Sequence, residues 1–424
     1  MTRIKAGLPL LCCLIFLGCD SKPENADEHN KNSSQPSTEF SAGNCPDFIP
    51  PPANQLSLNS GLPNPFVNQN GTVVETRQQW ACRRNEIREQ AQAYIYGEKP
   101  PRPKHVSGDL SDNSINVKVS HRNQTIEFSA ELVLPAVGSA PYPTLINVGA
   151  KGGYGGITLG EQRILDQGVA IIYFNHYALG KEGKPEASRG LQNPGLFYDL
   201  YGGEHSAGLL AAWAWGASRL IDVLYESDQT LIDANSLGVT GCSRNGKGAF
   251  AIGLFDDRIA LTIAHETSTA GVPAFRIVDK LNTERSDHNY YGLNWLSNNF
   301  EPFVMNTAQL PIDTHSLMGV IAPRGLLILD NVHERQMSAP AGFVAASAGA
   351  EIYAALGARE NISYHSKVEN TGHCRYKEAY TALIEQNIRK FLKHEPAATG
   401  EFIVGDGGEL KVSDWVNWAA PDLK

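Results

Sequence analysis

The chain has 424 residues, of which 42% are hydrophobic, and its formal net charge is −9. An acidic chain without a basic run is not typical of nucleic-acid binding, so we expect no nucleic-acid partner. It contains no His-x-x-x-His motif and no tight Cys/His cluster, which argues against a metal site. We expect neither a metal nor another cofactor.

The first 19 residues have the pattern of an export signal. Two basic residues precede an apolar core at positions 8–17, and Gly18-Cys19 follows it. The core is too short for a transmembrane helix, and no later run of about 18 apolar residues exists. A small residue before a cysteine also suggests a lipid anchor on Cys19. We therefore expect an exported protein, either a periplasmic or cell-surface lipoprotein or a secreted one.

Composition divides the rest of the chain. Residues 20–44 are rich in Ser, Asn, Glu and Pro and cannot bury a core, so they are predicted to be a disordered tether. Residues 45–394 contain no second linker and are interpreted as one catalytic domain of a monomer, although their length could hold two domains. Residues 395–424 are expected to form an irregular tail with a short β-prone piece.

Hydrophobic patterns in residues 45–394 predict an α/β fold. The later apolar runs alternate with helical patterns, above all at residues 206–225, which favours a mostly parallel sheet with helices on both faces, a three-layer αβα sandwich. The predicted strands are residues 115–119, 126–134, 144–148, 169–174, 237–240, 259–264, 326–329 and 362–368.

Residues 241–247 read Gly-Cys-Ser-Arg-Asn-Gly-Lys and lie between a predicted strand and a helix-like stretch. This is the setting of a nucleophile elbow, the turn that presents the serine of an α/β-hydrolase, here Ser243. Asn245 occupies the place of the motif's second glycine, and Gly246 comes one residue late. Because Asn is the non-glycine residue that best tolerates a left-handed backbone, the turn remains feasible with Asn245 in this place. A glycine-rich loop without catalytic function is the alternative.

A serine nucleophile needs a base and an acid, which follow it in the chain of this fold class. His373 lies after the last predicted strand, where that base is expected, but four other histidines also lie near glycine or acidic residues: His205, His265, His315 and His333. Two acids are candidates. Glu266 ends the strand at 259–264, whereas Glu334 follows the next strand, the more usual position of the acid. The residues alone leave both open.

Four cysteines lie beyond the signal. Cys242 precedes the predicted nucleophile and Cys374 follows the predicted base, so a bridge between them would join the two catalytic loops. In an oxidising compartment, Cys45–Cys82 and Cys242–Cys374 are the most economical of the three possible pairings. Buried free thiols are the alternative.

The chain resembles the glucuronoyl esterases, carbohydrate esterase family 15, which cut the ester between glucuronic acid of xylan and an alcohol of lignin. The elbow at 241–249 is similar to the family signature, because arginine directly after the nucleophile is unusual among serine hydrolases. The resemblance extends over about residues 45–392, with further similar segments at 61–66, 80–87, 197–202, 212–216, 259–266, 313–317 and 321–325.

The resemblance implies an α/β-hydrolase with a triad. In this family pattern Ser243 is the nucleophile, His373 the base and Glu266 the orienting acid, while Arg244 donates to the oxyanion. It also implies the two disulfides named above.

The resemblance further implies residues that bind the substrate. Lys247 is expected to bind the hydroxyl groups of the uronate ring, and Glu284 and Trp295 are expected to line the pocket. Glu334 is also a candidate contact, because it begins a stretch, Glu334-Arg335-Gln336, that replaces a sugar-stacking tryptophan of the family.

The function implied is that of a serine esterase acting on esters of (4-O-methyl-)glucuronic acid in glucuronoxylan and lignin, by way of an acyl-enzyme. Acetyl-xylan or feruloyl ester hydrolysis is the nearer alternative. A catalytically inactive, surface-tethered glycan-binding protein is the farther one.

Overall fold

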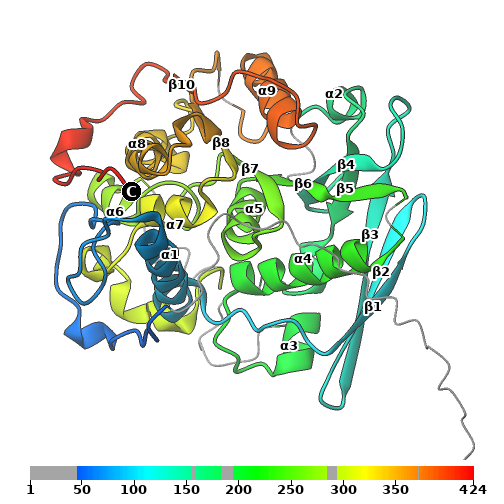
Figure 1. Cartoon of the computed structure of the whole chain (residues 1–424), viewed down its shortest axis with the longest axis horizontal. Coiled ribbons are helices and arrows are strands. Elements are labelled where there is room, and N and C mark those ends of the chain that lie inside the picture. The colour runs from blue at the N-terminus through cyan, green and yellow to red at the C-terminus, as the bar shows by residue number, and fades with distance from the viewer. Residues whose placement is uncertain (1–44, 154–158, 183–193, 229, 284–293, 371) are drawn as a thin grey trace, which may run out of the picture. The chain divides into compact units, whose positions relative to one another are not determined.

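The computed structural model describes residues 45–153, 159–182, 194–228, 230–283, 294–370 and 372–424. These residues are organised around one ten-stranded sheet with the order β1-β2-β3-β5-β4-β6-β7-β8-β9-β10 (Figure 1). The strands are β1 His105–Leu110, β2 Ser114–His121, β3 Gln124–Val133, β4 Tyr142–Val148, β5 Ala170–Phe174, β6 Ile232–Cys242, β7 Ile259–His265, β8 Gly325–Leu329, β9 Ile362–His365 and β10 Phe402–Ile403.

The sheet is antiparallel at one end and parallel through the rest. Strands β1, β2, β3 and β5 pair antiparallel, whereas the pairs from β5 through β10 are parallel. This confirms the predicted α/β fold class and places all eight predicted strands in the sheet. Sequence patterns miss β1 because only Val106 in it is buried, and β10 because it has two residues.

Helices cover both faces of the sheet. Successive residues of a strand point to opposite faces, and in β8 Leu326 and Ile328 join one apolar core while Leu327 and Leu329 join the other. The first core lies against α4, α5, α7 and α8, and the second lies against α2 and α9 (Figure 1). The helices are α1 Arg77–Ala91, α2 Glu161–Leu165, α3 Leu196–Tyr201, α4 Leu209–Glu226, α5 Arg244–Phe255, α6 Phe275–Leu281, α7 Thr314–Ile321, α8 Ala339–Ala355 and α9 Thr381–Phe391.

The order of the parallel strands positions the candidate site. Strands β6, β7, β8 and β9 are successive neighbours in the sheet. Their carboxyl ends lie at one edge, which is where open α/β sheets bind ligands. Ser243 follows β6, Glu266 follows β7 and the loop that carries His373 follows β9. Residues far apart in the sequence are thereby brought to a common edge.

Both ends of the described chain are tied to the body of the domain. The Cys45–Cys82 disulfide, with a Cα–Cα distance of 5.3 Å, attaches the first described residue to α1. In the C-terminal segment 395–424, β10 extends the sheet, and Trp415 and Leu423 are buried in the first core. This segment, expected as a tail, therefore contributes to the domain's core.

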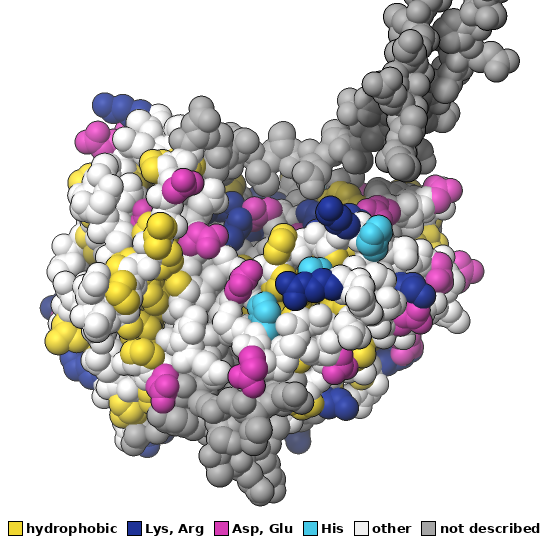
Figure 2. All heavy atoms as spheres, turned by 90° about the horizontal axis from the view of Figure 1, so that it is seen from below, with side chains coloured by type: hydrophobic (Ala, Val, Ile, Leu, Met, Phe, Trp, Pro, Cys, Tyr) yellow, Lys and Arg dark blue, Asp and Glu magenta, His cyan; other side chains and the backbone are white. Residues whose placement is uncertain are grey.

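No helix within the described ranges is long and apolar enough to cross a membrane. On the face drawn in Figure 2, acidic and basic side chains are interspersed rather than segregated into separate fields.

Candidate active site

Ser243 lies in a sharp turn between β6 and α5. Its backbone has φ 60° and ψ −128°, a conformation that costs a non-glycine residue free energy and is found at functional sites. The turn closes only where neighbouring side chains are absent. A Cβ atom on Gly241 would lie 2.4 Å from the backbone oxygen of Asn245, and one on Gly246 would lie 2.7 Å from that of His265. The nucleophile elbow is thus present.

The elbow differs from the expected one in which residue carries the unusual backbone. The motif would have allowed a left-handed Asn245, but Asn245 is an ordinary residue of α5, and the positive φ belongs to Ser243. Gly246, one position later than in the common motif, makes the close approach to β7. The shifted glycine therefore serves the packing of helix on strand rather than the turn itself.

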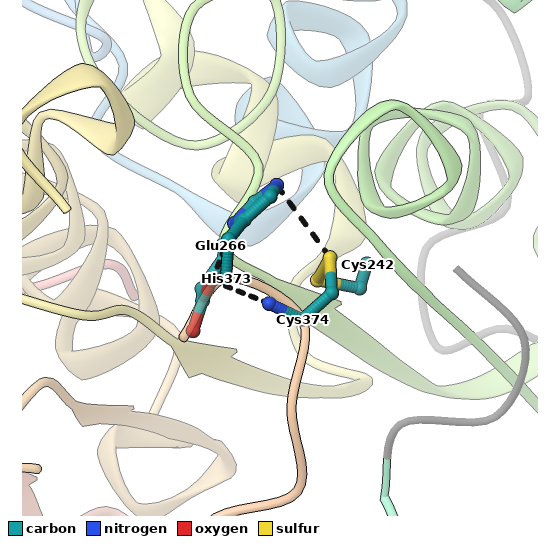
Figure 3. A group of neighbouring side chains, drawn as sticks. All are labelled: Cys242, Glu266, His373 and Cys374. Carbon is teal, nitrogen blue, oxygen red and sulfur yellow. Dashed lines mark hydrogen bonds and ion pairs between the residues drawn. A yellow bond between two sulfur atoms is a disulfide. The ribbon is translucent and has the colours of Figure 1, made fainter. Parts of the chain in front are cut away.

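His373 and Glu266 form a short hydrogen-bonded pair beside this elbow (Figure 3). His373 Nδ1 lies 2.6 Å from Glu266 Oε2, which also accepts from the backbone N–H of Cys374 at 2.9 Å. The Glu266 carboxylate is fully buried, whereas the His373 side chain is 21% exposed. With the carboxylate on Nδ1, Nε2 is the nitrogen that can serve a reacting hydroxyl group. In this structure Nε2 lies 3.6 Å from Cys374 Sγ (Figure 3).

Glu266 is held in its ionised form. Burial alone would raise the pKa of its carboxyl group, but hydrogen bonds from His265, His373 and the Cys374 N–H outweigh burial and hold the pKa well below its usual value. Asn331 Nδ2 lies 3.4 Å from the other carboxylate oxygen. Glu266 is therefore negatively charged at neutral pH.

Glu334 contacts the same loop at another point. Its Oε1 accepts from the backbone N–H of Gly372 at 2.9 Å, and its Oε2 accepts from Gln336 at 2.9 Å. The structure thus pairs the histidine with Glu266, and Glu334 with the backbone of the residue before His373. Of the two acids that the residues alone left open, Glu266 has the geometry of the orienting acid.

The usual acid position at the end of β8 holds a third carboxyl group, Asp330. It is completely buried and lies against α8, where a Cβ on Gly342 would come within 2.3 Å of its Oδ2. Burial raises its pKa from 3.8 to about 8, and the charge of Glu266 acts in the same direction. Asp330 is thus a neutral acid below that pH.

This raised pKa predicts a pH-dependent stability. Between pH 3.8 and about 8 the folded protein keeps the Asp330 proton and the unfolded chain loses it, so the stability that this group contributes falls as the pH rises. Asp330→Asn removes this loss. In thermal unfolding, we expect the melting temperature of the variant minus that of wild type to be larger at pH 8 than at pH 5. An equal difference at both pH values would contradict the assignment.

Arg244, the residue after the nucleophile, is fixed by two partners. Its Nη1 forms an ion pair with Glu182 and lies 3.3 Å from the hydroxyl group of Tyr177. Burial opposes its charge, but Glu182 and Tyr177 together hold the pKa of Arg244 above its ordinary value. A cation that stays charged and fixed beside the nucleophile suits stabilisation of an oxyanion.

Lys247 lies one helical turn beyond Ser243 and is buried. Its Nζ lies 3.9 Å from the centre of the Trp295 ring, and the Trp295 Nε1 donates to Glu182 Oε1 at 2.6 Å. The structure thus brings Lys247 and Trp295 together next to Arg244. Glu284, the remaining expected pocket residue, lies outside the described residues.

A small cavity of about 170 Å³ lies beside the elbow. The loop after β4 and the loop after β5 line it together with Arg244 and Asn245, and buried His176 contributes to its wall. Burial, with the charge of Arg244, lowers the pKa of His176 to about 3. The imidazole of His176 is therefore neutral, and the cavity adjoins the residue expected to bind the oxyanion.

The Cys242–Cys374 disulfide joins the residue before Ser243 to the residue after His373, with a Cα–Cα distance of 5.7 Å. Both expected bridges are confirmed. Potential ligand atoms of Cys242, Glu266, His373 and Cys374 lie within 4.8 Å of one another (Figure 3). Metal ligation by cysteine requires a thiolate, however, and these two sulfur atoms are bonded to each other. The two cysteines therefore link the two loops covalently and do not offer thiolate ligands to a metal.

Sequence reasoning did not find Tyr177, Glu182 or Asp330. Glu182 lies in a polar loop after β5 with no motif around it, so the sequence contains no signal for it. Asp330 directly follows an apolar strand, and its position at the strand end is a signal that could have been used.

The chain matches the family model of glucuronyl esterases of fungi over residues 117–357. It is 36% identical to a 4-O-methyl-glucuronoyl methylesterase of Podospora anserina over 90% of this chain and 78% of that protein. It is also 36% identical to one of Thermothelomyces thermophilus, over 87% of this chain and 90% of that protein.

The solved structures that resemble this chain are also glucuronoyl esterases. The glucuronoyl esterase catalytic domain of Hypocrea jecorina superimposes with a TM-score of 0.79 at 34% identity, covering 87% of this chain and 99% of that one. A serine-to-alanine mutant of the Sporotrichum thermophile enzyme, solved with methyl 4-O-methyl-β-D-glucopyranuronate, has a TM-score of 0.79 at 34% identity and covers 87% of this chain and 97% of that one. This chain belongs to the glucuronoyl esterase family.

Proposed function

We propose that this protein is a serine esterase that hydrolyses esters of (4-O-methyl-)glucuronic acid through an acyl-enzyme on Ser243. The observation that carries the proposal is the 2.6 Å hydrogen bond between His373 and Glu266 beside a nucleophile elbow. Membership of the glucuronoyl esterase family supports the substrate class, as does the related enzyme solved with a methyl glucuronate ester.

In the proposed first step, the Ser243 oxygen attacks the carbonyl carbon of the ester and His373 accepts the hydroxyl proton. Glu266, already ionised, stabilises the imidazolium that forms. Negative charge develops on the carbonyl oxygen, where Arg244 donates. The carbon–oxygen bond to the alcohol then breaks, and the imidazolium returns its proton to the departing alcohol.

In the second step water replaces the alcohol. His373 accepts a proton from the water as its oxygen attacks the acyl carbon, and then protonates the Ser243 oxygen as the uronic acid leaves. Lys247, held against Trp295, is proposed to bind the ring hydroxyl groups. Arg244 favours the anionic transition state and product over the neutral ester, because only they carry the charge that it stabilises.

The natural substrate proposed is the ester between glucuronoxylan and lignin alcohols. A panel of esters tests this against the nearer alternatives. Purified protein should hydrolyse methyl and benzyl glucuronate with a kcat/KM far above that for p-nitrophenyl acetate or methyl ferulate. Preference for the acetyl or feruloyl ester would contradict the proposed function.

The protein is further proposed to be an exported monomer, with a signal at residues 1–19, a tether at 20–44 and the catalytic domain beginning at Cys45. The two disulfides support export, because such bridges persist in oxidising compartments. The Gly18-Cys19 pair supports a lipid anchor on Cys19 and hence residence in the periplasm or at the cell surface.

A further inference from the structure

Glu182 lies at the meeting point of three segments of the candidate site. Its Oε1 accepts from Trp295 Nε1 at 2.6 Å, and its Oε2 accepts from the Tyr177 hydroxyl group at 2.7 Å. The same Oε2 forms the ion pair with Arg244 Nη1. Its side chain is 8% exposed. One carboxylate thus joins the loop after β5, the nucleophile elbow and the segment that contains Trp295.

A buried carboxylate needs partners, and here the partners are themselves candidate site residues. Ionised carboxyl groups removed from water are costly unless hydrogen bonds and opposite charge compensate them. Glu182 receives two neutral donors, from Trp295 and Tyr177, and one cation, Arg244. All three partners of Glu182 thus lie in the candidate site.

The contacts determine how Arg244 is presented. A free arginine side chain has several rotatable bonds, and an oxyanion donor is effective only when it is held in place before the reaction. Glu182 and Tyr177 both hold Nη1, and the guanidinium carbon lies 5.9 Å from the centre of the Trp295 ring. Two partners therefore hold Nη1, and the guanidinium lies within cation–π range of Trp295.

The contacts also reach Lys247. The Trp295 indole is oriented by its hydrogen bond to Glu182, and its ring lies 3.9 Å from Lys247 Nζ. Glu182 therefore contacts Arg244, which is proposed to bind the oxyanion. Through Trp295 it is also connected to Lys247, which is proposed to bind the sugar hydroxyl groups.

We propose that Glu182 is a positioning residue that holds the Arg244 guanidinium and the Trp295 indole in the geometry used for catalysis. The inference rests on the proposed function, because it assigns the effect of Glu182 to the oxyanion role of Arg244. It predicts that a change which weakens only the contact of Glu182 with Arg244, and keeps the contact with Trp295, lowers turnover and changes substrate binding little.

Glu182→Gln separates these two connections. The glutamine oxygen can still accept from Trp295, whereas its NH₂ group, which is neutral and only donates, faces Arg244 and cannot hold it. For methyl glucuronate we expect kcat to fall about 10- to 100-fold, near the loss of one oxyanion donor, with KM changed less than about threefold. Glu127→Gln, which removes the partner of Lys118 in an exposed ion pair, is the control and should match wild type.

A double-mutant cycle provides the decisive readout. If Glu182 acts through Arg244, then Glu182→Gln should change kcat less than about threefold when introduced into Arg244→Met, although it is severe alone. A structural effect would lower kcat in both backgrounds. Equal losses in both, or an unchanged kcat for Glu182→Gln in the wild-type background, would overturn the proposal.

Tyr177→Phe gives a second route if Glu182→Gln does not fold. It removes one hydroxyl group from the same cluster and should lower kcat about 3- to 10-fold, with this loss also absent in Arg244→Met. A loss that persists there would again overturn the proposal. Wild-type protein that cleaves another ester but not glucuronate would refute the proposed function instead, and the cycle would then be measured on the ester that is cleaved.

Discussion

Replacing Ser243 or His373 by alanine is expected to abolish hydrolysis of methyl glucuronate. Both residues act in the same bond-making step, so either loss should cost about as much as losing both, roughly 10⁶-fold in kcat. The measurement is release of glucuronic acid by the purified variants over hours at high enzyme concentration.

The expected loss concerns chemistry and not folding. Ser243 is the strained residue of the elbow, and alanine keeps the backbone able to take φ 60° with no larger side chain to accommodate. Circular dichroism spectra and melting temperatures close to those of wild type would establish that both variants fold. A folded variant that retained more than a few per cent of the activity would refute the triad.

Replacing Glu266 by alanine is expected to be nearly as damaging, whereas Glu334→Ala should be mild. Glu266 orients the base through the 2.6 Å bond to His373 Nδ1, and loss of such a carboxylate costs about 10⁴-fold in turnover. Glu334 reaches only the backbone of Gly372. Its loss should loosen the loop and lower kcat by less than about tenfold, in line with one lost hydrogen bond. Steady-state kinetics of both variants decide the matter.

Glu334→Ala is the matched control for this comparison, since both changes remove a carboxylate from the same histidine loop. Two equal, modest losses would mean that the acids share the role. A severe effect at Glu334 beside a nearly silent one at Glu266 would show that the acid is assigned wrongly.

The central sheet could be predicted because burial imposes a pattern on the strands. Strands β5 and β8 are buried along their whole length, so they form continuous apolar runs that stand out from their surroundings. Strand β1 buries a single residue and contains Gly108, so pairing with β2 rather than its own composition makes it a strand. The same holds for β10, whose two residues are ordered by β9.

Those residues of the candidate site that lie in recognisable sequence motifs could be predicted. Ser243, Arg244 and Lys247 belong to one contiguous segment. The predicted disulfide between the cysteines next to Ser243 and His373 indicated that this segment lies near His373. The choice of Glu266 over Glu334 came from the family resemblance, because both residues follow strands. Glu182 could not be found this way, since it becomes significant only when folding places it against Arg244 and Trp295.

The most direct test of the account is to trap the acyl-enzyme. Purified protein mixed with benzyl glucuronate, quenched in acid within the first turnovers and digested, should give a peptide containing Ser243 whose mass is increased by one glucuronoyl group. The same experiment with Ser243→Ala should give no such adduct. A wild-type adduct on another residue, or steady release of glucuronic acid by Ser243→Ala, would contradict the proposal that Ser243 is the nucleophile of a glucuronate esterase.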